Sequence, residues 1–410
     1  MKILCFIESY LPGTKGGGPV RGLSNMVAQL SEHHEFFILT RNHDYLDSNA
    51  YPNIKPNEWI KDEAGSQVYY ASGQCWKRAS IEAIEALKPD WIYLQGALSP
   101  MTRQLLSARK WNKALHKVKV LLAPHGNLSP ATLKHHAWRK YFWLSYAKTR
   151  NLYSHVSWHS ASARESEQIR KCFGAGVDIR EVPMAPAPRE FSERVTEPNP
   201  APFNPNLELD SRQPAKCLRL VYFGRLSPEK NLEFAFKCLS EFATTHPDTQ
   251  VVYDVIGSGS SGYVSQLEAI AHQMPANLHI SFIGQLSVSA LRAQLYQSAD
   301  SNDASLEARG AYACMLMPSR TENFSYTILE SLQAGIPVLV SDQTPWRDLM
   351  AKGVGWDLPL QAVDSWCLAL EELSRQSAAE ESERRQRVLN FAQQRGDEYS
   401  QKAVELFHRT

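Results

Sequence analysis

The sequence predicts an α/β fold built from two parallel-sheet domains. Short apolar, β-branched runs alternate with longer segments of helical periodicity, a pattern typical of βαβ units whose sheets are covered on both faces. The alternation stops in a proline-rich stretch and then starts again. At 410 residues the chain is also longer than one hydrophobic core usually serves, because single cores stop growing at roughly 250–300 residues. We therefore expect two Rossmann-like domains.

The first domain is expected over residues 1–182, where six apolar runs read as strands. They are Ile3–Ile7, Phe36–Thr40, Val68–Tyr70, Trp91–Leu94, Val118–Ala123 and, more weakly, His155–His159. Residues 183–214 follow as a linker, because their eight prolines leave no room for a helix or a central strand.

The second domain is expected over residues 215–385, where the alternation resumes. Its predicted strands are Leu218–Phe223, Val251–Ile256, His279–Ile283, Cys314–Met317 and Val338–Val340. The tail from about Asp364 is helical by pattern, and residues 386–410 are expected to form a C-terminal helix that can pack back on the first domain.

Composition limits the kinds of partner that the protein can bind and the cell compartment in which it is expected. The 44 basic and 43 acidic residues leave a formal charge of +1, so we expect no nucleic-acid partner and only a local site for anions. Seven cysteines lie singly with no CxxC pair, which indicates reduced core residues rather than a zinc site. The first apolar run ends at Glu8, and no stretch of ~18 apolar residues follows, so a cytoplasmic protein is expected.

Two glutamates stand out in the second domain, in the segment from Pro318 to Gly335. Glu322 and Glu330 would lie ~12 Å apart along one ideal helix, so they cannot form a close carboxylate pair. The pattern instead places Glu322 in a loop after a strand and Glu330 one or two turns into the following helix. The backbone N–H groups near Asn323–Tyr326 would then lie at a helix N-terminus, which suits a diphosphate.

A second motif, Gly224-Arg225-Leu-Ser-Pro228-Glu-Lys230-Asn231, follows the first strand of the same domain. Pro228 is expected to open a helix, since proline is favoured in the first helical turn. Arg225 and Lys230 alone would be solvated surface charges. Beside a diphosphate, the same cations would stabilise the charge of a departing nucleotide.

Together these motifs resemble the signature of family-four retaining glycosyltransferases, which have the GT-B fold of two Rossmann-like domains facing across a cleft. The resemblance implies that Glu322 contacts the donor sugar, that Glu330 binds the nucleotide ribose, and that Arg225 and Lys230 bind the donor diphosphate. The family usually has Gly-Phe-Gly after the first glutamate. Here the donor-binding residues at those positions are Asn323, Phe324 and Ser325.

In the first domain, Gly16, Gly17 and Gly18 lie between a strand and a helix and resemble the family's glycine-rich loop against the donor phosphates. The alternative is a nicotinamide site, but Pro19 interrupts that fingerprint, and the strand Phe36–Thr40 ends in no acidic residue.

His125 ends another predicted strand of this domain. Its segment Ala123–Pro130 resembles the Pro-Arg/His-Gly-x-Leu element of polysaccharide-building members. His125 is therefore the candidate at the reaction centre, bonding a donor-sugar hydroxyl or its phosphate. The alternative is a hydrogen-bonded structural histidine. Gln95 stands before Gly96 where relatives often have histidine, and an acceptor role for it stays open.

The resemblance implies transfer of a sugar, with retention, from a nucleotide-diphosphate-sugar to a glycan or lipid-linked glycan acceptor, in polysaccharide or lipopolysaccharide synthesis. No two carboxylates are placed as in a retaining glycosidase, so the donor phosphate is the expected base. No Asp-x-Asp motif is present, so no metal and no other cofactor are expected. A nucleotide-sugar epimerase or hydrolase of the same fold and a non-catalytic sugar-binding module remain as alternatives.

Residues 133–150 combine five basic residues with five aromatic ones. Such a helix can lie on an anionic membrane, which would make the protein peripheral on the inner face of the cytoplasmic membrane. It can equally be a packed helix with a solvated face. Residues 301–312 read as an insertion to which the sequence gives no role.

Overall fold

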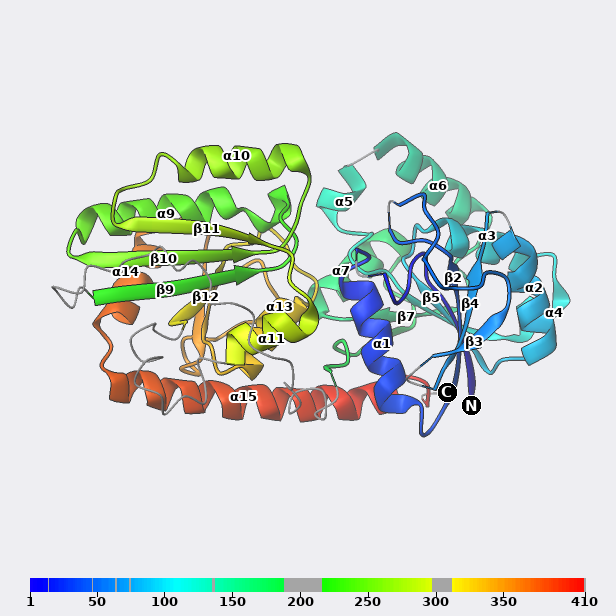
Figure 1. The fold of residues 1–410 in the computed structure, drawn as a ribbon. Helices are drawn as coiled ribbons and strands as arrows, with labels where there is room; N and C mark the ends of the chain where they lie inside the picture. The colour runs from blue at the N-terminus through cyan, green and yellow to red at the C-terminus, as the bar shows by residue number, and fades with distance from the viewer. Residues whose placement is uncertain are drawn as a thin grey trace. The chain divides into compact units, whose positions relative to one another are not determined.

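The computed structural model describes residues 1–13, 15–45, 47–62, 65–73, 75–134, 137–187, 216–296 and 312–408. Most of the expected linker 183–214 and nearly all of the expected insertion 301–312 lie outside these ranges. The chain divides into two compact units (Figure 1). The first comprises Met1–Phe191 and Gly396–Thr410, and the second comprises Ser192–Arg395.

The first unit contains an eight-stranded sheet in the order β3-β4-β2-β1-β5-β6-β7-β8. Its strands are β1 (Lys2–Phe6), β2 (Glu35–Arg41), β3 (Trp59–Lys61), β4 (Gln67–Ala71), β5 (Trp91–Gln95), β6 (Lys119–Ala123), β7 (Val156–Ser160) and β8 (Ile179–Glu181). All neighbours pair in parallel except β3 with β4. The strand order reverses between β1 and β5, and ligands of such sheets bind at the carboxyl ends of the strands beside this reversal.

Helices cover both faces of this sheet. They are α1 (Gly18–Leu30), α2 (Cys75–Leu87), α3 (Pro100–Arg109), α4 (Lys113–Lys117), α5 (Pro130–Lys134), α6 (Ala137–Thr149) and α7 (Ala163–Phe173). Successive residues of β1 enter opposite cores: Leu4 and Phe6 join one apolar cluster, whereas Ile3 and Cys5 join the other. The strand is therefore apolar throughout rather than alternating, as expected for a parallel strand buried on both faces.

The second unit contains a six-stranded parallel sheet in the order β11-β10-β9-β12-β13-β14 (Figure 1). Its strands are β9 (Lys216–Phe223), β10 (Thr249–Ile256), β11 (Leu278–Gly284), β12 (Cys314–Met317), β13 (Val338–Ser341) and β14 (Gly355–Leu358). Its helices are the 3-10 helix η1 (Pro228–Lys230), α9 (Leu232–Thr245), α10 (Ser261–Ala271), α11 (Val288–Tyr296), α13 (Tyr326–Gln333) and α14 (Val363–Arg375). The order reverses between β9 and β12, so the loops that follow these two strands are neighbours.

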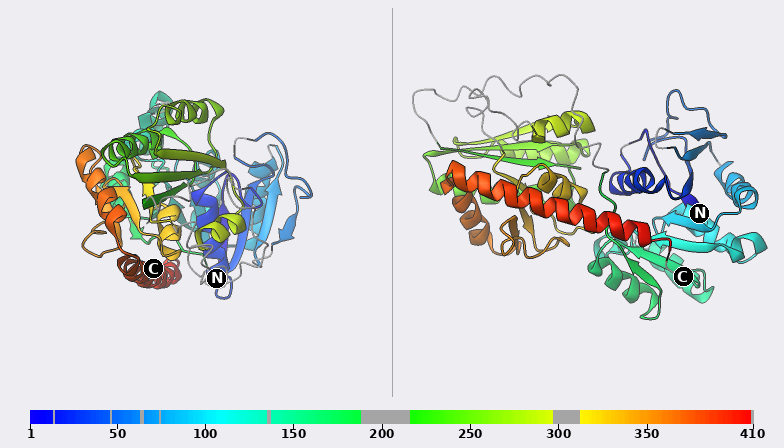
Figure 2. Two further views of the ribbon diagram at one scale, coloured as in Figure 1. Left: turned by 60° about the vertical axis from the view of Figure 1, so that its left-hand side comes forward. Right: turned by 90° about the horizontal axis from the view of Figure 1, so that it is seen from below.

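The helix α15 (Ala378–Glu405) begins in the second unit and ends in the first, as one unbroken helix (Figure 2). Within the first unit, Ala403, Leu406 and Phe407 belong to the same apolar cluster as α1. The Phe407 ring packs edge-to-face against Trp91 and Tyr93. The C-terminal residues thus complete the core of the first unit.

Two local predictions differ from the structure. Pro228 opens a single 3-10 turn and not the α-helix, because Asn231 takes a left-handed conformation (φ 58°) and α9 begins only at Leu232. The strands β3, β8 and β14 were not predicted, because β3 and β8 are three-residue strands with partly exposed side chains and β14 begins with glycine. Across the part of the chain that the structure describes, no helix combines the length and apolar character that crossing a membrane would need.

Candidate functional site

In the second unit, close backbone contacts hold the loop that follows β9. Gly224 donates its N–H to Ile256 O at 2.9 Å, and Leu226 donates to Ser258 O at 2.8 Å. A Cβ atom on Gly257 would lie 1.8 Å from Gly224 O, so only glycine fits at position 257. The loop that presents Arg225 and Lys230 is therefore fixed by packing against the loop that follows β10.

Arg225 and Lys230 extend from this loop in different environments. The Arg225 side chain is exposed, whereas its carbonyl accepts a hydrogen bond of 2.7 Å from the hydroxyl of Tyr222. Tyr222 is fully buried, and burial raises its pKa, so the phenol stays protonated and remains a donor. The backbone at Arg225 is fixed while its guanidinium stays accessible.

Lys230 forms an ion pair with Glu322, the residue expected to contact the donor sugar. Lys230 Nζ lies 2.5 Å from Glu322 Oε1, and the two side chains are only 19% and 11% exposed. These residues are separated by 91 others in the sequence and meet because β9 and β12 are adjacent strands. The structure thus brings together two of the predicted site residues.

Asn231 and Arg320 link the two loops beside this ion pair. Asn231 Oδ1 accepts hydrogen bonds from Nε and Nη2 of Arg320, at 3.1 and 2.9 Å, and Asn231 Nδ2 donates to Pro318 O at 3.2 Å. Arg320 N donates to Glu229 O at 2.8 Å. Sequence reasoning missed both residues, although asparagine is among the few residues that accept the left-handed conformation found at position 231.

Asn323, Phe324 and Ser325 lead into helix α13. Phe324 is buried, and its carbonyl accepts a hydrogen bond of 2.6 Å from Trp346 Nε1. Ser325 has φ 66°, a conformation that favours glycine, and its hydroxyl lies 2.9 Å from that of Thr327. Asn323 is not among the residues with positive φ. Of the two positions at which the family has glycine, only that of Ser325 takes up a glycine-like conformation.

Glu330 is the fifth residue of α13 and is half-buried. Its charge contributes to a raised pKa of Tyr296 at the end of α11. Burial is the main cause of that shift, and Arg292 of the same helix opposes it. Gly335, with φ 74°, follows the end of α13.

In the first unit, the three glycines of the loop after β1 have different roles. A Cβ on Gly16 would lie 2.5 Å from Val20 Cγ2 and 2.7 Å from Ser9 Oγ, so a larger residue would require these side chains to move. Gly17 caps helix α1 with φ 66°. A Cβ on Gly18 would meet nothing within 4 Å, so packing places no demand on that position.

His125 follows β6 with a positive φ of 51° and is half-buried. Its Nε2 contacts Gln95 Oε1 at the end of β5. Burial, with a smaller contribution from His159, lowers the pKa of His125 to about 3, so the ring is neutral at physiological pH. The next residue, Gly126, donates its N–H to the buried carboxylate of Glu165 at 2.8 Å.

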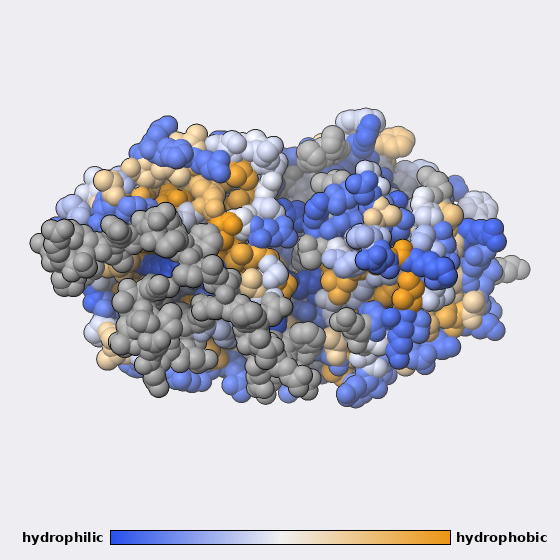
Figure 3. All heavy atoms as spheres, viewed as in Figure 1, coloured by the Kyte–Doolittle hydropathy of each residue, from blue (hydrophilic) through white to orange (hydrophobic). Residues whose placement is uncertain are grey.

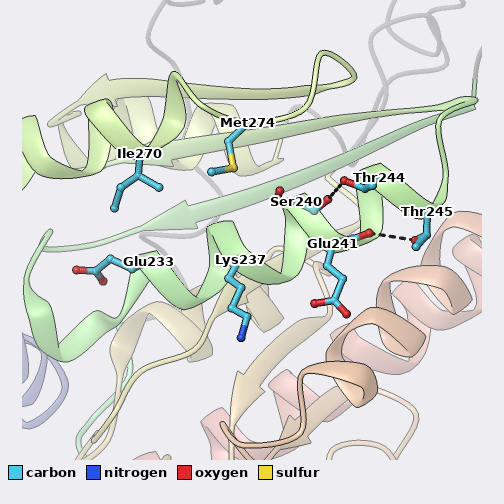
Figure 4. Close-up of a pocket in the computed structure, with 8 residues that line it drawn as sticks. All are labelled: Glu233, Lys237, Ser240, Glu241, Thr244, Thr245, Ile270 and Met274. Atoms are coloured by element: carbon cyan, nitrogen blue, oxygen red, sulfur yellow. Dashed lines mark hydrogen bonds between the residues drawn. The ribbon is translucent and has the colours of Figure 1, made fainter.

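A surface groove of about 450 Å³ lies between α9 and α10 (Figure 4). It is lined by Glu233, Lys237, Ser240, Glu241, Thr244, Thr245, Ile270 and Met274. The Thr244 and Thr245 hydroxyls hydrogen-bond to carbonyls of their own helix, and none of the predicted site residues lines the groove. Within the described ranges, no group of three or more His, Cys, Asp or Glu side chains is placed to hold a metal ion.

Comparisons with known proteins bear on the family. Residues 210–395 match the model of the family described as "Glycosyl transferases group 1". An uncharacterised glycosyltransferase of Methanocaldococcus jannaschii is 26% identical over 122 residues. That alignment spans 30% of this chain and only 26% of the length of the relative. Over residues 210–395 the chain is therefore similar to group 1 glycosyltransferases.

Solved structures resemble the whole chain. HepE of Anabaena, in complex with UDP and glucose, superposes with a TM-score of 0.65 at 14% identity and full coverage of both chains. Trehalose-6-phosphate synthase OtsA gives 0.66 at 12% identity, covering 100% of this chain and 99% of that one. WaaG, a glycosyltransferase involved in lipopolysaccharide biosynthesis, gives 0.62 at 12% identity with full coverage of both. The predicted GT-B fold of two Rossmann-like domains is confirmed.

Proposed function

We propose that this protein is a retaining glycosyltransferase that moves a sugar from a nucleotide-diphosphate-sugar to a glycan or lipid-linked glycan acceptor in cell-surface polysaccharide synthesis. The similarity to group 1 glycosyltransferases and the GT-B fold support a transferase that uses a nucleotide-sugar. The observation that carries the proposal is the ion pair of Lys230 with Glu322 at the adjoining ends of β9 and β12.

A nucleotide-sugar offers each member of this ion pair a replacement partner. Its diphosphate would take the charge of Lys230, and its sugar hydroxyls would donate to Glu322. The exposed guanidinium of Arg225 would meet the same diphosphate. As the bond to the sugar breaks, negative charge grows on the leaving phosphate, and cations already in place stabilise that charge.

Glu330 would bind the nucleotide ribose, because a half-buried carboxylate is a strong acceptor for two hydroxyls. We propose uridine as the base, since HepE has been solved with UDP and with UDP-glucose. In the first unit, Gly16, Gly17 and Gly18 would lie against the phosphates, and His125 would bond the donor sugar. Asn323, Phe324 and Ser325 would offer backbone N–H groups at the start of α13.

Retention follows if the acceptor hydroxyl attacks from the face that the nucleotide leaves, with the donor phosphate taking the proton. The cations Arg225 and Lys230 would then supply the charge stabilisation that a metal ion provides elsewhere. We therefore propose catalysis without a metal, and activity should survive dialysis against a chelator.

The acceptor is proposed to be lipid-linked because of the surface of α6. Trp138 and Phe142, 71% and 74% exposed, lie on the side opposite buried Leu144 and Ala147, and Arg139 and Lys148 are exposed on either flank. The outer edge of the first unit carries hydrophobic and hydrophilic side chains together where α6 lies (Figure 3). Exposed aromatics beside cations suit the interface of an anionic membrane.

Calorimetric titration with UDP tests the donor site. Glu330→Ala should weaken UDP binding by at least tenfold, because the ribose hydroxyls lose a charged acceptor contributing roughly 1.5–3 kcal/mol. Glu268→Ala, which removes an exposed glutamate of α10, should bind UDP as the wild type does. Equal affinities of the two variants would contradict the assignment of Glu330.

Product analysis separates the proposed transferase from its alternatives. Incubation with UDP-sugars should yield a glycoside of retained anomeric configuration only when an acceptor is present. Conversion of the donor without any acceptor would indicate an epimerase or hydrolase, and binding without conversion would indicate a sugar-binding module.

A further inference from the structure

Three buried polar side chains form a row beneath His125 in the sheet of the first unit. Tyr93 and Gln95 lie on β5, on the same side because they are two residues apart, and His159 lies on β7. They are 1%, 4% and 1% exposed. The strand β6 runs between β5 and β7 and ends just before His125, so the row lies directly beside that residue.

The hydrogen positions along this row follow from the hydrogen bond of His159 with the backbone. His159 Nε2 lies 2.8 Å from Val182 O, and a carbonyl oxygen only accepts, so His159 must donate from Nε2. His159 is neutral because burial lowers its pKa to about 4, so its Nδ1 is an acceptor. The Tyr93 hydroxyl, 2.6 Å from that nitrogen, must therefore donate to it.

Tyr93 has then used its only proton, so towards Gln95 its oxygen can only accept. Gln95 Nε2 is buried and forms no hydrogen bond within the described residues, and the Tyr93 side chain lies on the same side of β5, two residues away. Burial raises the pKa of Tyr93, and the neighbouring Gln95 amide acts against that rise. The amide N–H group of Gln95 is thus directed to Tyr93, and its Oε1 faces His125.

We propose that Gln95, Tyr93 and His159 are positioning residues that fix His125 in the tautomer with its proton on Nε2. Because Oε1 of Gln95 can only accept, Nε2 of His125 must donate to it. Among the described residues, the structure shows no hydrogen bond to the other ring nitrogen, Nδ1, so this nitrogen presents a lone pair. This lone pair suits a hydroxyl donor and not a phosphate oxygen.

The backbone of His125 is held separately from its ring. Glu165 accepts hydrogen bonds from Gly126 N at 2.8 Å and from Ala161 N at 2.9 Å, which fixes the turn of positive φ. Loss of the Gln95 contact should therefore change the tautomer of the ring without moving the chain. The proposed function enters this inference at one point, where the hydroxyl that donates to Nδ1 of His125 is assigned to the donor sugar.

Two-bond ¹H–¹⁵N spectra of the ligand-free, ¹⁵N-histidine protein at pH 7.5 test the proposal, with His125 assigned from the His125→Gln spectrum. The wild type should show a pyrrole-type Nε2 and a pyridine-type Nδ1. Gln95→Leu should shift His125 towards a mixture of tautomers. Tyr93→Phe should do the same indirectly, through its effect on Gln95. Tyr153→Phe, which removes another buried hydroxyl of this unit, should leave the tautomer unchanged.

A proton on Nδ1 in the wild type would overturn the proposal, as would a Tyr93→Phe spectrum identical to the wild type. Saturating pyrophosphate should leave Nδ1 unprotonated, and its protonation would also overturn the proposal. These measurements need no transfer activity, so failure of the proposed function in activity assays would not alter their result.

Discussion

Lys230 and Glu322 form an ion pair between the loops that follow β9 and β12. Both side chains are largely buried, so removal of one partner leaves the other charge desolvated and unpaired. We expect Lys230→Ala to lower the unfolding free energy of the second unit by about 3 kcal/mol. Adding Glu322→Gln should recover most of that stability while transfer activity stays absent. Urea unfolding and activity assays of the single and double variants measure both effects.

The matched control is Glu383→Ala, which removes an exposed ion pair with Arg387 in the same unit. An exposed pair of this kind should contribute less than about 1 kcal/mol. Strictly additive losses in the Lys230→Ala/Glu322→Gln double variant would mean that the two side chains are not energetically coupled.

His159 gives the first unit a defined dependence on pH. The ring has a pKa of about 4 in the folded protein, well below the ordinary value of 6.5, because it is buried. The unfolded chain therefore binds a proton first as pH falls, and stability that is fully present above pH 6.5 is lost towards pH 4. His125 acts in the same direction, and Glu165, whose pKa burial raises, acts in the opposite one.

Urea unfolding at pH values from 7 to 5 should show this loss, with His159 contributing up to roughly 1.4 kcal/mol per pH unit. The variant His159→Gln, though less stable overall, should show a shallower slope. An unchanged slope would mean that His159 has the same pKa in the folded protein as in the unfolded chain.

At this scale the sequence predicted which residues belong to the candidate donor site but not how they meet. The motif spacing indicated Lys230 and Glu322, whereas their ion pair depends on strand order, which spacing does not contain. The Asn231–Arg320 contact was not predicted either, because it also depends on strand order. Gln95 was noted only for its place before Gly96, and its link to His159 crosses the intervening strand β6.

At the scale of elements, apolar runs predicted the strands, and strands without such a run were not predicted. Each of the eleven predicted strands overlaps an observed one, because fully buried parallel strands are apolar at every position. β3 is an antiparallel strand at the sheet edge with partly exposed residues, so it carries no such run. Local backbone conformation was also not predicted. Ser325 takes a left-handed conformation, which a serine in the sequence does not indicate.

Helix α6 exposes aromatic and basic side chains that the packing of the first unit does not require. If it lies on lipid, each exposed cation should contribute up to ~1 kcal/mol, and salt should weaken the attraction. We expect the protein to sediment with anionic vesicles at low salt and to be released at high salt. Changing Arg139 and Lys148 to glutamate should abolish sedimentation. Lys140 is unsuitable for this test, because its Nζ donates to Thr132 O at 2.6 Å and a change there would disturb packing.

Trp138→Ser and Phe142→Ser should weaken vesicle binding at all salt concentrations, since they remove apolar contacts rather than charge. The exposed Trp111, outside α6, provides the control in Trp111→Ser. Sedimentation that is absent, or that survives the Arg139 and Lys148 changes, would make α6 a packed helix with a solvated face.

At the scale of the whole molecule, the sequence predicted two parallel α/β domains because the alternation of strands and helices is interrupted once. The strand order of each sheet was not predictable, since the pattern does not say on which side a new strand joins. Each sheet reverses its order beside its first strand, and the glycine-rich loop and the Arg225 loop both follow such first strands. The order of the strands thus explains why the motifs lie at the ends of β1 and β9.

The last residues of the chain are the strongest case of long-range dependence. Phe407 is 2% exposed and lies among Trp91, Tyr93 and Phe36, and Arg180 donates to Leu406 O at 2.5 Å. Phe407→Ala should therefore lower the stability of the first unit by about 3–5 kcal/mol, the usual cost of a large cavity in a core. Hydrogen exchange should become faster in β1, β2 and β5 and stay unchanged in β9 to β13. Val404→Ala, at an exposed position near the end of α15, is the control. Faster exchange in both units, or in neither, would contradict the assignment of these C-terminal residues to the first core.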